Sequence, residues 1–319
     1  EDGFFITSPL VSKYFSQCIA KNYINIIKSV ELDSIVELGP GNAALAIELL
    51  FYLKDKGCLP KKYYFYERSI LLTKKQKRIM ERAGLEKNVE FIWIDNFENF
   101  PKESFIIANE LFDCIPTDLI KYKNNTFMKG YVDKSYRIIW EDYDFLSDSI
   151  SSLLALPFDI PNNYIFEFSK EQYNIINSLD KFVNKAYLII FDYGYSANEL
   201  YIPDRMNGTV SCIRNHLSDF NPLTEIGDKD ISSFVNFSYI NNIFKRCTWQ
   251  TETFINQSNY LLGYDILNDI NKSNIDDINS IKQLIMPNQM GEIFKVLIVK
   301  KNLKELENNR FVQNDIIKL

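Results

Sequence analysis

The stretch Ile35-Val36-Glu37-Leu38-Gly39-Pro40-Gly41-Asn42-Ala43 decides the fold class of this chain. It consists of an apolar run that ends in an acidic residue, a Gly-x-Gly turn and the start of a helical apolar pattern. A strand, a glycine turn and a helix in this order are typical of the first unit of a nucleotide- or nucleoside-binding α/β fold. Glycine suits the turn because the backbone must bend sharply and approach a ligand without an intervening Cβ atom.

The segments around this unit alternate between strand-like and helical patterns. Such alternation predicts an α/β fold whose central sheet is mostly parallel and has right-handed crossovers. The pattern breaks after Pro116, where residues 118–141 alternate like hairpin strands around Asn124-Asn125. We expect strands at 34–38, 62–67, 89–94, 104–108, 186–191 and 292–300, and helices at 12–29, 43–53, 70–82, 231–245, 256–269 and 274–286.

These patterns divide the chain into four parts. Residues 1–29 are expected to form an N-terminal loop and helix that flank the cofactor site, and residues 30–117 with 185–300 to form the core. Residues 118–184 are expected to form a β-rich insertion or lid, and 195–229 to be mostly loop. The charged, amphipathic segment 301–319 predicts a peripheral C-terminal tail with a helix.

Composition excludes several function classes. The 319 residues carry a formal net charge of −6 without a strongly basic block, which argues against general nucleic-acid binding. No apolar run approaches the roughly 20 residues that a membrane span needs. Five scattered cysteines suggest free thiols in a reducing compartment such as the cytoplasm. His216 is the only histidine, so no metal site is expected.

The glycine turn alone leaves two cofactors open. Gly39-x-Gly41-x-x-Ala44 matches the relaxed dinucleotide fingerprint, and Glu67 ends the second expected strand. A carboxylate at that position accepts hydrogen bonds from two ribose hydroxyls, in NAD and in S-adenosylmethionine alike. An NAD-dependent oxidoreductase and a methyltransferase therefore both fit these two features.

Two residues favour the sulfonium cofactor. Glu37 stands directly before the turn, where a carboxylate would repel a pyrophosphate but suit the methionine ammonium group. Pro40 removes one backbone N–H from the turn, which weakens a phosphate cradle more than an amino-acid cradle. Both observations favour S-adenosyl-L-methionine over a dinucleotide.

Polar residues follow three further expected strands. Asp95 could accept from an adenine amino group, or be a surface acid that opens a loop. Asn109, Glu110 and Asp113 fall at the carboxyl edge of the sheet, where ligands bind in open α/β folds; helix capping by Asn109 is the alternative. Asp192 ends a later core strand and could line the acceptor side or form a structural turn.

Read together, these motifs resemble the MidA family of class I S-adenosylmethionine-dependent methyltransferases. The matches follow the family's order from residue 3 to about residue 299. They are Thr7-Ser8-Pro9, Glu37-Leu38-Gly39-Pro40-Gly41, Glu67 with Gln76, Asn109-Glu110 with Asp113 and Pro116, Asp192-Tyr193-Gly194, Gly208-Thr209, Arg214 with His216, Gly227 with Asp230-Ile231, Val235 with Phe237, and Met290-Gly291-Glu292-Phe294-Lys295.

The resemblance implies a Rossmann-like class I methyltransferase fold and methylation of an arginine side chain in a partner protein. Mitochondrial members of the family assist the assembly of respiratory complex I, which implies a respiratory-complex subunit as partner and, in a eukaryote, the mitochondrial matrix as location. The residues expected to bind the cofactor are Thr7, Ser8, Glu37, Gly39, Gly41, Glu67, Asp95 and Asn109. The residues expected to act on the acceptor are Glu110, Asp113 and Asp192.

Five positions depart from the family's pattern. The family usually has aspartate where Phe4 stands, glutamate at Leu10, Arg-Gly at Asn42-Ala43 and often histidine at Phe234. Ala43 keeps the turn small, so these departures concern the acceptor side more than the cofactor. A non-catalytic assembly factor that retains the methyltransferase fold is the other alternative to an enzyme, because fold alone does not establish activity.

Overall fold

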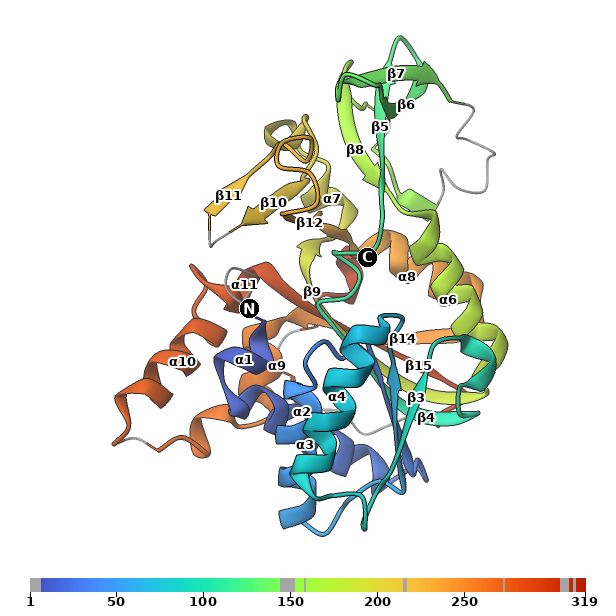
Figure 1. The fold of residues 1–319 in the computed structure, drawn as a ribbon. Coiled ribbons are helices and arrows are strands. Elements are labelled where there is room, and N and C mark those ends of the chain that lie inside the picture. Colours follow the sequence, from blue (N-terminus) through green and yellow to red (C-terminus); the bar gives the residue numbers. More distant parts are fainter. Residues whose placement is uncertain are drawn as a thin grey trace.

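A mostly parallel sheet forms the centre of the computed structural model, which describes residues 7–143, 153–157, 159–214, 217–271, 273–304, 310–311 and 314–319 (Figure 1). All its long strands run in one direction except the antiparallel β15. Short β13 (Val235–Asn236) pairs with the end of β9. The strand order is β14 (Trp249–Asn256), β15 (Phe294–Lys301), β9 (Lys185–Tyr195), β4 (Glu103–Asn109), β1 (Ser34–Leu38), β2 (Lys62–Tyr66) and β3 (Glu90–Ile94).

The strand order reverses between β1 and β4, because the chain adds β2 and β3 on one side of β1 and later adds β4 and β9 on the other. In open α/β sheets, ligands bind beyond the carboxyl ends of the strands at such a switch point. The glycine turn after β1 and the polar residues after β4 both lie there. The predicted α/β fold is thus confirmed, and the switch point locates the site.

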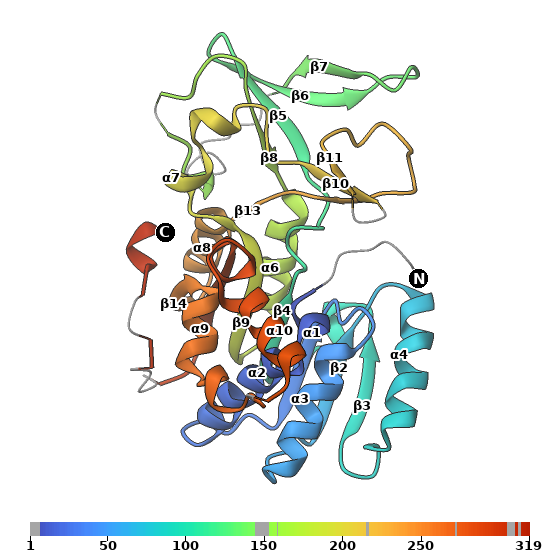
Figure 2. The same cartoon turned by 90° about the vertical axis from the view of Figure 1, so that its left-hand side faces the viewer.

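Helices cover both faces of the sheet, because alternate residues of each strand point to opposite faces. Ile35 of β1 belongs to the core shared with α2 (Lys13–Ile27), α3 (Ala44–Asp55) and α4 (Ile70–Ala83). Val36 and Leu38 belong to the opposite core, with α6 (Lys170–Phe182) and α8 (Phe237–Arg246). α9 (Gln257–Gly263) and α10 (Ile275–Ile285) extend the first layer (Figure 2).

Two accessory sheets stand over the carboxyl edge of the main sheet (Figure 1). Asn124 and Asn125 adopt positive φ angles of 50° and 63° at the first hairpin turn, as a tight two-residue hairpin requires. One sheet has the order β7 (Ile138–Asp142), β6 (Thr126–Val132), β5 (Asp118–Lys123) and β8 (Tyr164–Phe168). The other has the order β11 (Leu217–Asp219), β10 (Ser211–Arg214) and β12 (Asp230–Ser232).

The structure corrects three expectations. Residues 195–229 are not mostly loop, since they include β10, β11, α7 (Ala197–Leu200) and the 3-10 turn Pro203–Arg205. The helix expected at 231–245 begins only at Phe237, where Asn236 caps it by accepting from the Tyr239 N–H. β14 was not expected. In the described part of the tail, the 3-10 turn Ile316–Lys318 replaces the expected helix.

The division into core and insertion stays a prediction, but packing bears on its boundary. Ile176 and Leu179 of α6 pack in the same core as Leu188 and Ile190 of the main sheet. The last part of the predicted insertion therefore covers the main sheet. Among the described residues, no helix combines the length and apolar character that crossing a membrane requires.

Candidate active site

The glycine turn adopts the backbone geometry that the sequence predicts. Gly39 and Gly41 have φ angles of 66° and 53°, in the left-handed region that glycine tolerates. A Cβ atom on Gly39 would lie 3.0 Å from Leu111 Cδ1, whereas one on Gly41 would meet open space. The turn is therefore packed on its inner side and accessible at Gly41, before α3 begins at Ala44.

Gln76 of α4 connects the glycine turn to the second and third strands. Its Nε2 donates to the Gly41 carbonyl at 2.8 Å and to the Glu67 Oε2 at 3.1 Å. Its Oε1 accepts from the Trp93 indole N–H at 3.0 Å. Gln76 is fully buried, so these bonds are shielded from water. Gln76 is among the residues that match the family's pattern, but the sequence predicts no role for it. Because it bonds to two predicted site residues, Gln76 is a positioning residue.

Glu67 and Asp95 end neighbouring strands, but only Glu67 is held in place. The other carboxylate oxygen of Glu67 accepts from the Ser69 N–H at 2.8 Å, and Ser69 caps α4. Asp95 is exposed, and among the described residues its carboxylate accepts only from the Asn96 side chain, at 3.0 Å. Glu67 is therefore oriented before any ligand binds, whereas Asp95 is free to turn.

Glu37 does not present the negative charge that the sequence suggested. Its side chain is buried and accepts from the Tyr63 hydroxyl at 2.7 Å. Burial raises the pKa of Glu37 to about 8, although the Tyr63 hydrogen bond lowers it. The carboxyl group is thus mostly protonated at pH 7, and repulsion of a pyrophosphate by Glu37 is not an argument in the ligand-free protein.

The N-terminal segment reaches the carboxyl end of β4. The Ser8 N–H donates to Glu110 Oε1 at 2.9 Å, and the Ser8 hydroxyl donates to Gln257 Oε1 at 3.2 Å. Thr7 caps the short helix α1 (Ser8–Val11) through its backbone carbonyl, which accepts from the Leu10 N–H. Both predicted N-terminal residues therefore lie beside Glu110.

Asn109 offers a polar atom without a partner at the switch point. Its Nδ2 donates to Glu110 Oε1 at 3.2 Å, but its Oδ1 is buried and accepts no hydrogen bond from any residue in the described part of the chain. A buried polar atom is expensive to leave unpaired. Asn109 Oδ1 is therefore ready to accept from a ligand N–H or O–H.

Asp192 holds the segment after β4. Its Oδ2 accepts from the Phe112 N–H at 2.7 Å and the Asp113 N–H at 3.3 Å, and its Oδ1 accepts from the Tyr193 N–H at 3.0 Å. Asp192 is fully buried. Both of its carboxylate oxygens are thus engaged with the backbone, which gives Asp192 a positioning role rather than contact with an acceptor.

Glu110, Asp113 and Asp192 form an acidic trio at this edge. Burial raises the pKa of Glu110 to about 7 and that of Asp113 to about 6, and Asp113 adds repulsion at Glu110. Burial, Asp113 and Glu110 together raise the pKa of Asp192 well above its ordinary value. Asp113 Oδ1 is buried and has no hydrogen-bond partner among the residues that the structure describes. Negative charge is therefore costly in the trio without a ligand, and Asp113 Oδ1 is the atom that a cation or a donor could satisfy.

Aromatic rings border the trio. Tyr193 donates to the Ser232 hydroxyl and packs edge-on against Phe234, with ring centroids 5.3 Å apart. Gly194 is required here, because a Cβ atom would clash with the Val235 backbone of β13. Leu10 is exposed and Phe234 lies in this aromatic group, whereas Phe4 and His216 lie outside the described residues.

The donor set does not suit a metal. Among the described residues, no group of three or more His, Cys, Asp or Glu side chains is arranged to hold an ion. The acidic trio fits this finding, because both carboxylate oxygens of Asp192 accept hydrogen bonds from backbone N–H groups.

Comparison with known proteins agrees with the geometry. Residues 18–255 match a family described as "Putative S-adenosyl-L-methionine-dependent methyltransferase". A Burkholderia thailandensis protein bound to S-adenosyl-homocysteine has a similar structure, with a TM-score of 0.86, 23% identity, and coverage of 98% of this chain and 82% of that one. The native structure of an uncharacterised superfamily protein from the same organism is also similar, with a TM-score of 0.85 and 23% identity. The match covers 97% of this chain and 84% of that one. No curated protein sequence matches the chain.

Proposed function

Since the chain belongs to this family of S-adenosyl-L-methionine-dependent methyltransferases, we propose that it transfers the methyl group to an arginine side chain of a partner protein. The observation that carries the proposal is the buried, unpartnered Oδ1 of Asp113 beside Glu110 at the carboxyl edge of the main sheet. A guanidinium group is cationic and presents several N–H donors, so it suits a carboxylate oxygen that lacks a partner.

The residues around the glycine turn fit the cofactor. Open space at Gly41 leaves room for a ligand, Glu67 is oriented to accept from ribose hydroxyls, and Asn109 Oδ1 needs a donor such as an ammonium group. We propose these three residues as its main contacts, with Thr7, Ser8, Glu37, Gly39 and Asp95 around them. When bound, S-adenosyl-L-methionine supplies a methyl group that is electrophilic because it is attached to a sulfonium.

The protein's own contribution is to bind, orient and deprotonate the acceptor. Asp113, with a pKa of about 6, is mostly ionised at pH 7 and attracts the guanidinium. One carboxylate at about 4 Å contributes roughly 4 kcal/mol at an effective dielectric constant of about 20, before desolvation is counted. Glu110, with a pKa of about 7, is suited to accept the proton that the guanidinium nitrogen must lose when it takes up the methyl group. Asp192 keeps the backbone of Asp113 in position.

The resemblance to the MidA family adds a respiratory-complex subunit as the candidate partner. Family membership favours a methyltransferase over the NAD-dependent oxidoreductase. The non-catalytic assembly factor stays the competing proposal, because oriented cofactor residues do not establish transfer.

The test is incubation of the purified chain with methyl-labelled S-adenosyl-L-methionine and an extract of its source organism. The expected result is label in a protein band whose acid hydrolysate contains methylarginine, and no such label with Asp113→Asn. Label on another amino acid would contradict the arginine proposal. Absence of label, with S-adenosylhomocysteine still bound in calorimetry, would favour the assembly factor.

A further inference from the structure

A cavity of about 460 Å³ lies between the two accessory sheets and reaches the acidic trio at Asp113. Resting on the proposed function, we propose that this groove binds an apolar segment of the acceptor protein next to the arginine that is methylated. It is lined by Asp113, Pro116 and Leu119 at its inner end, by Tyr131, Val132 and Ile138 on one wall, and by Val210, Leu223 and Ile231 on the other.

The walls are apolar although they face water. Val132 and Ile138 on the β6–β7 side are 55% and 37% exposed, and Ile231 on β12 is 50% exposed. Contiguous exposed apolar surface usually marks a site of interaction. Leu217 and Phe220, 76% and 81% exposed, lie on the same chain segment as Leu223 and extend apolar surface beyond the lining. Apolar surface both inside and outside the cavity suits a polypeptide better than a small molecule.

The inner end of the groove has the opposite character. Asp113 is 7% exposed and has an unpartnered carboxylate oxygen, and the Ser233 N–H donates to its backbone carbonyl at 3.1 Å. Asp118, the other acid in the lining, is already paired with Lys129 at 2.6 Å. A cation that enters the groove therefore meets Asp113 as the acid without an ion partner, while its flanking residues lie along apolar walls.

The two walls are joined at their base before any partner binds. Glu167 of β8 is half-buried, and its Oε1 accepts from the Thr209 N–H at 2.6 Å and the Val210 N–H at 3.1 Å. Thr209 Oγ1 donates to Glu167 Oε2 at 3.0 Å and accepts from the Phe234 N–H at 3.0 Å. One side chain of the first accessory sheet thus anchors the segment that enters the second.

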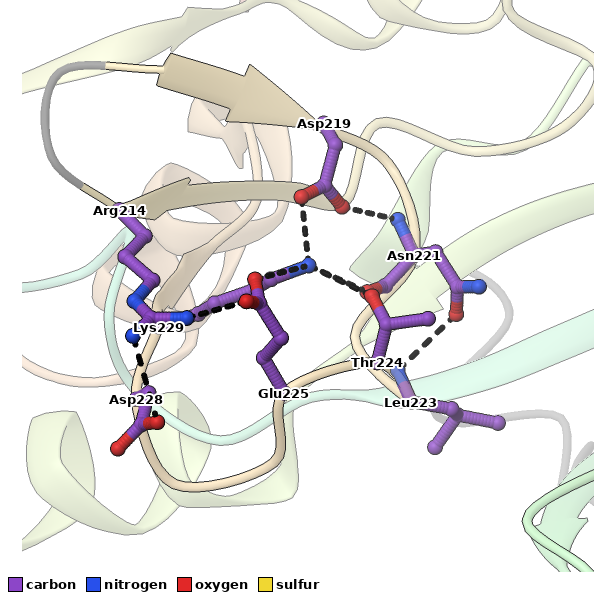
Figure 3. Close-up of polar contacts among 8 residues, drawn as sticks. All are labelled: Arg214, Asp219, Asn221, Leu223, Thr224, Glu225, Asp228 and Lys229. Carbon is purple, nitrogen blue, oxygen red and sulfur yellow. Dashed lines mark hydrogen bonds and ion pairs between the residues drawn. The ribbon is translucent and has the colours of Figure 1, made fainter.

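The outer wall is held by a polar network around Lys229 (Figure 3). The Lys229 ammonium group donates to Asp219 Oδ2 at 2.5 Å and to Thr224 Oγ1 at 2.6 Å, and its side chain is only 4% exposed. Asn221 Oδ1 accepts from the Leu223 N–H at 3.0 Å, which fixes the backbone of a lining residue. The groove is therefore preformed rather than shaped by its occupant.

Strand edges support an extended polypeptide as occupant. β7, which carries Ile138, is an edge strand of the four-stranded sheet, and β12, which carries Ile231, is an edge strand of the other. Edge strands have unpaired backbone groups to which an extended segment can add. Apolar side chains of such a segment would then fill the groove, with the arginine at Asp113.

The test uses three fluorescein-labelled octapeptides and fluorescence anisotropy, with the full chain saturated by S-adenosylhomocysteine. The first peptide contains an arginine next to the apolar residues Leu-Val-Leu-Val. The second is the same peptide with serine at those four apolar positions. The third is the first peptide with glutamine in place of the arginine. The first peptide is expected to bind at least about tenfold more tightly than the second. Equal affinity for the first two peptides would overturn the proposal.

Two neighbouring residues of β7 provide a matched pair of variants. Ile138→Asp is expected to abolish the preference for the apolar peptide, whereas Ile139→Asp is expected to keep it, because Ile139 is 42% exposed but is not part of the lining. Equal effects of both variants would contradict the groove. Thermal unfolding of each variant checks that it folds, and Ile231→Asp serves if Ile138→Asp does not.

Peptide binding and the labelling of extract proteins together separate this inference from the proposed function. Equal labelling of arginine in extract proteins by the wild type and by Ile138→Asp would support arginine methylation and contradict the proposed role of the groove. If the apolar preference depends on Ile138 but the arginine and glutamine peptides bind alike and no methylarginine forms, the groove stands and arginine methylation fails.

Discussion

The carboxyl edge of the main sheet and the accessory groove are held by different kinds of contact. At the edge, buried side chains bond to the backbone: Gln76 to the Gly41 carbonyl, and Asp192 to the N–H groups of Phe112 and Tyr193. On the outer wall of the groove, the partly exposed Asp219 instead pairs with Lys229. Buried bonds leave costly unpaired groups when broken, whereas exposed pairs contribute little. We therefore expect large changes in binding and chemistry from the edge, and small changes in stability from the groove.

The largest effect is expected where the two regions meet, at Asp113. Asp113→Asn should reduce methyl transfer by roughly 10³-fold, because an acceptor cation at about 4 Å loses on the order of 4 kcal/mol of attraction. The affinity for S-adenosylhomocysteine should stay unchanged, as calorimetry can check. Asp118→Asn is the matched control, since Asp118 lines the same cavity but pairs with Lys129. Full transfer by Asp113→Asn would remove Asp113 from the proposed chemistry.

The cofactor side of the edge is tested by Glu67→Ala. Loss of two hydrogen bonds from ribose hydroxyls to a carboxylate should weaken S-adenosylhomocysteine by at least about 100-fold, while circular dichroism shows an intact fold. Asp95→Ala should weaken it less, because Asp95 is exposed and not held by the protein. Unchanged affinity in Glu67→Ala would place the ribose elsewhere.

Glu37, at the carboxyl edge of the main sheet, should make the free energy of unfolding depend on pH. Because burial raises its pKa to about 8, the folded chain keeps a proton between pH 4.5 and 8 that the unfolded chain has lost. The free energy of unfolding should therefore fall as pH rises through this window. Glu37→Gln retains an acceptor for Tyr63 and removes this contribution, so at pH 8 it should be more stable than the wild type by on the order of 1–3 kcal/mol. Urea unfolding at pH 5, 6.5 and 8 without ligand checks this, and parallel pH profiles would contradict it.

The smallest effect on stability is expected in the groove, from Lys229→Met. Its partner Asp219 is 46% exposed and can be solvated, so the free energy of unfolding should change by only about 1 kcal/mol. Affinity for the apolar arginine peptide should nevertheless fall by about tenfold, because Lys229 would no longer bond to Asn221 and Thr224, which stand on either side of Leu223. Lys123→Met, at the exposed β5–β6 turn, should change neither quantity. A large loss of stability with unchanged peptide affinity would reverse the comparison.

The edge was largely predictable from the sequence because its determinants are local. Gly39, Gly41 and Glu67 follow strands directly, and the carboxyl ends of parallel strands meet at one edge. Burial was not predictable in the same way. Glu37 was expected to be charged, but exclusion of water raises its pKa and keeps it protonated, although the hydrogen bond from Tyr63 on the next strand favours the charged form.

The groove could not be predicted because its parts are distant in the sequence. Leu119, Ile138 and Leu223 meet only after two accessory sheets fold beside each other. The short strands β10 to β13 have two to four residues, too few for a period-two pattern to emerge. Gly208 stands where a Cβ atom would clash with Glu167. A glycine in the sequence can indicate such close packing, but the sequence does not identify the residue against which it packs.

The most direct test of the division between a cofactor edge and an acceptor groove is a crystal structure with S-adenosylhomocysteine. The ribose hydroxyls should donate to Glu67, the amino group should donate to Asn109 Oδ1, and the sulfur should point toward Asp113 and the inner end of the groove. S-adenosylhomocysteine bound away from residues 39–43, or its sulfur turned away from Asp113, would contradict the division.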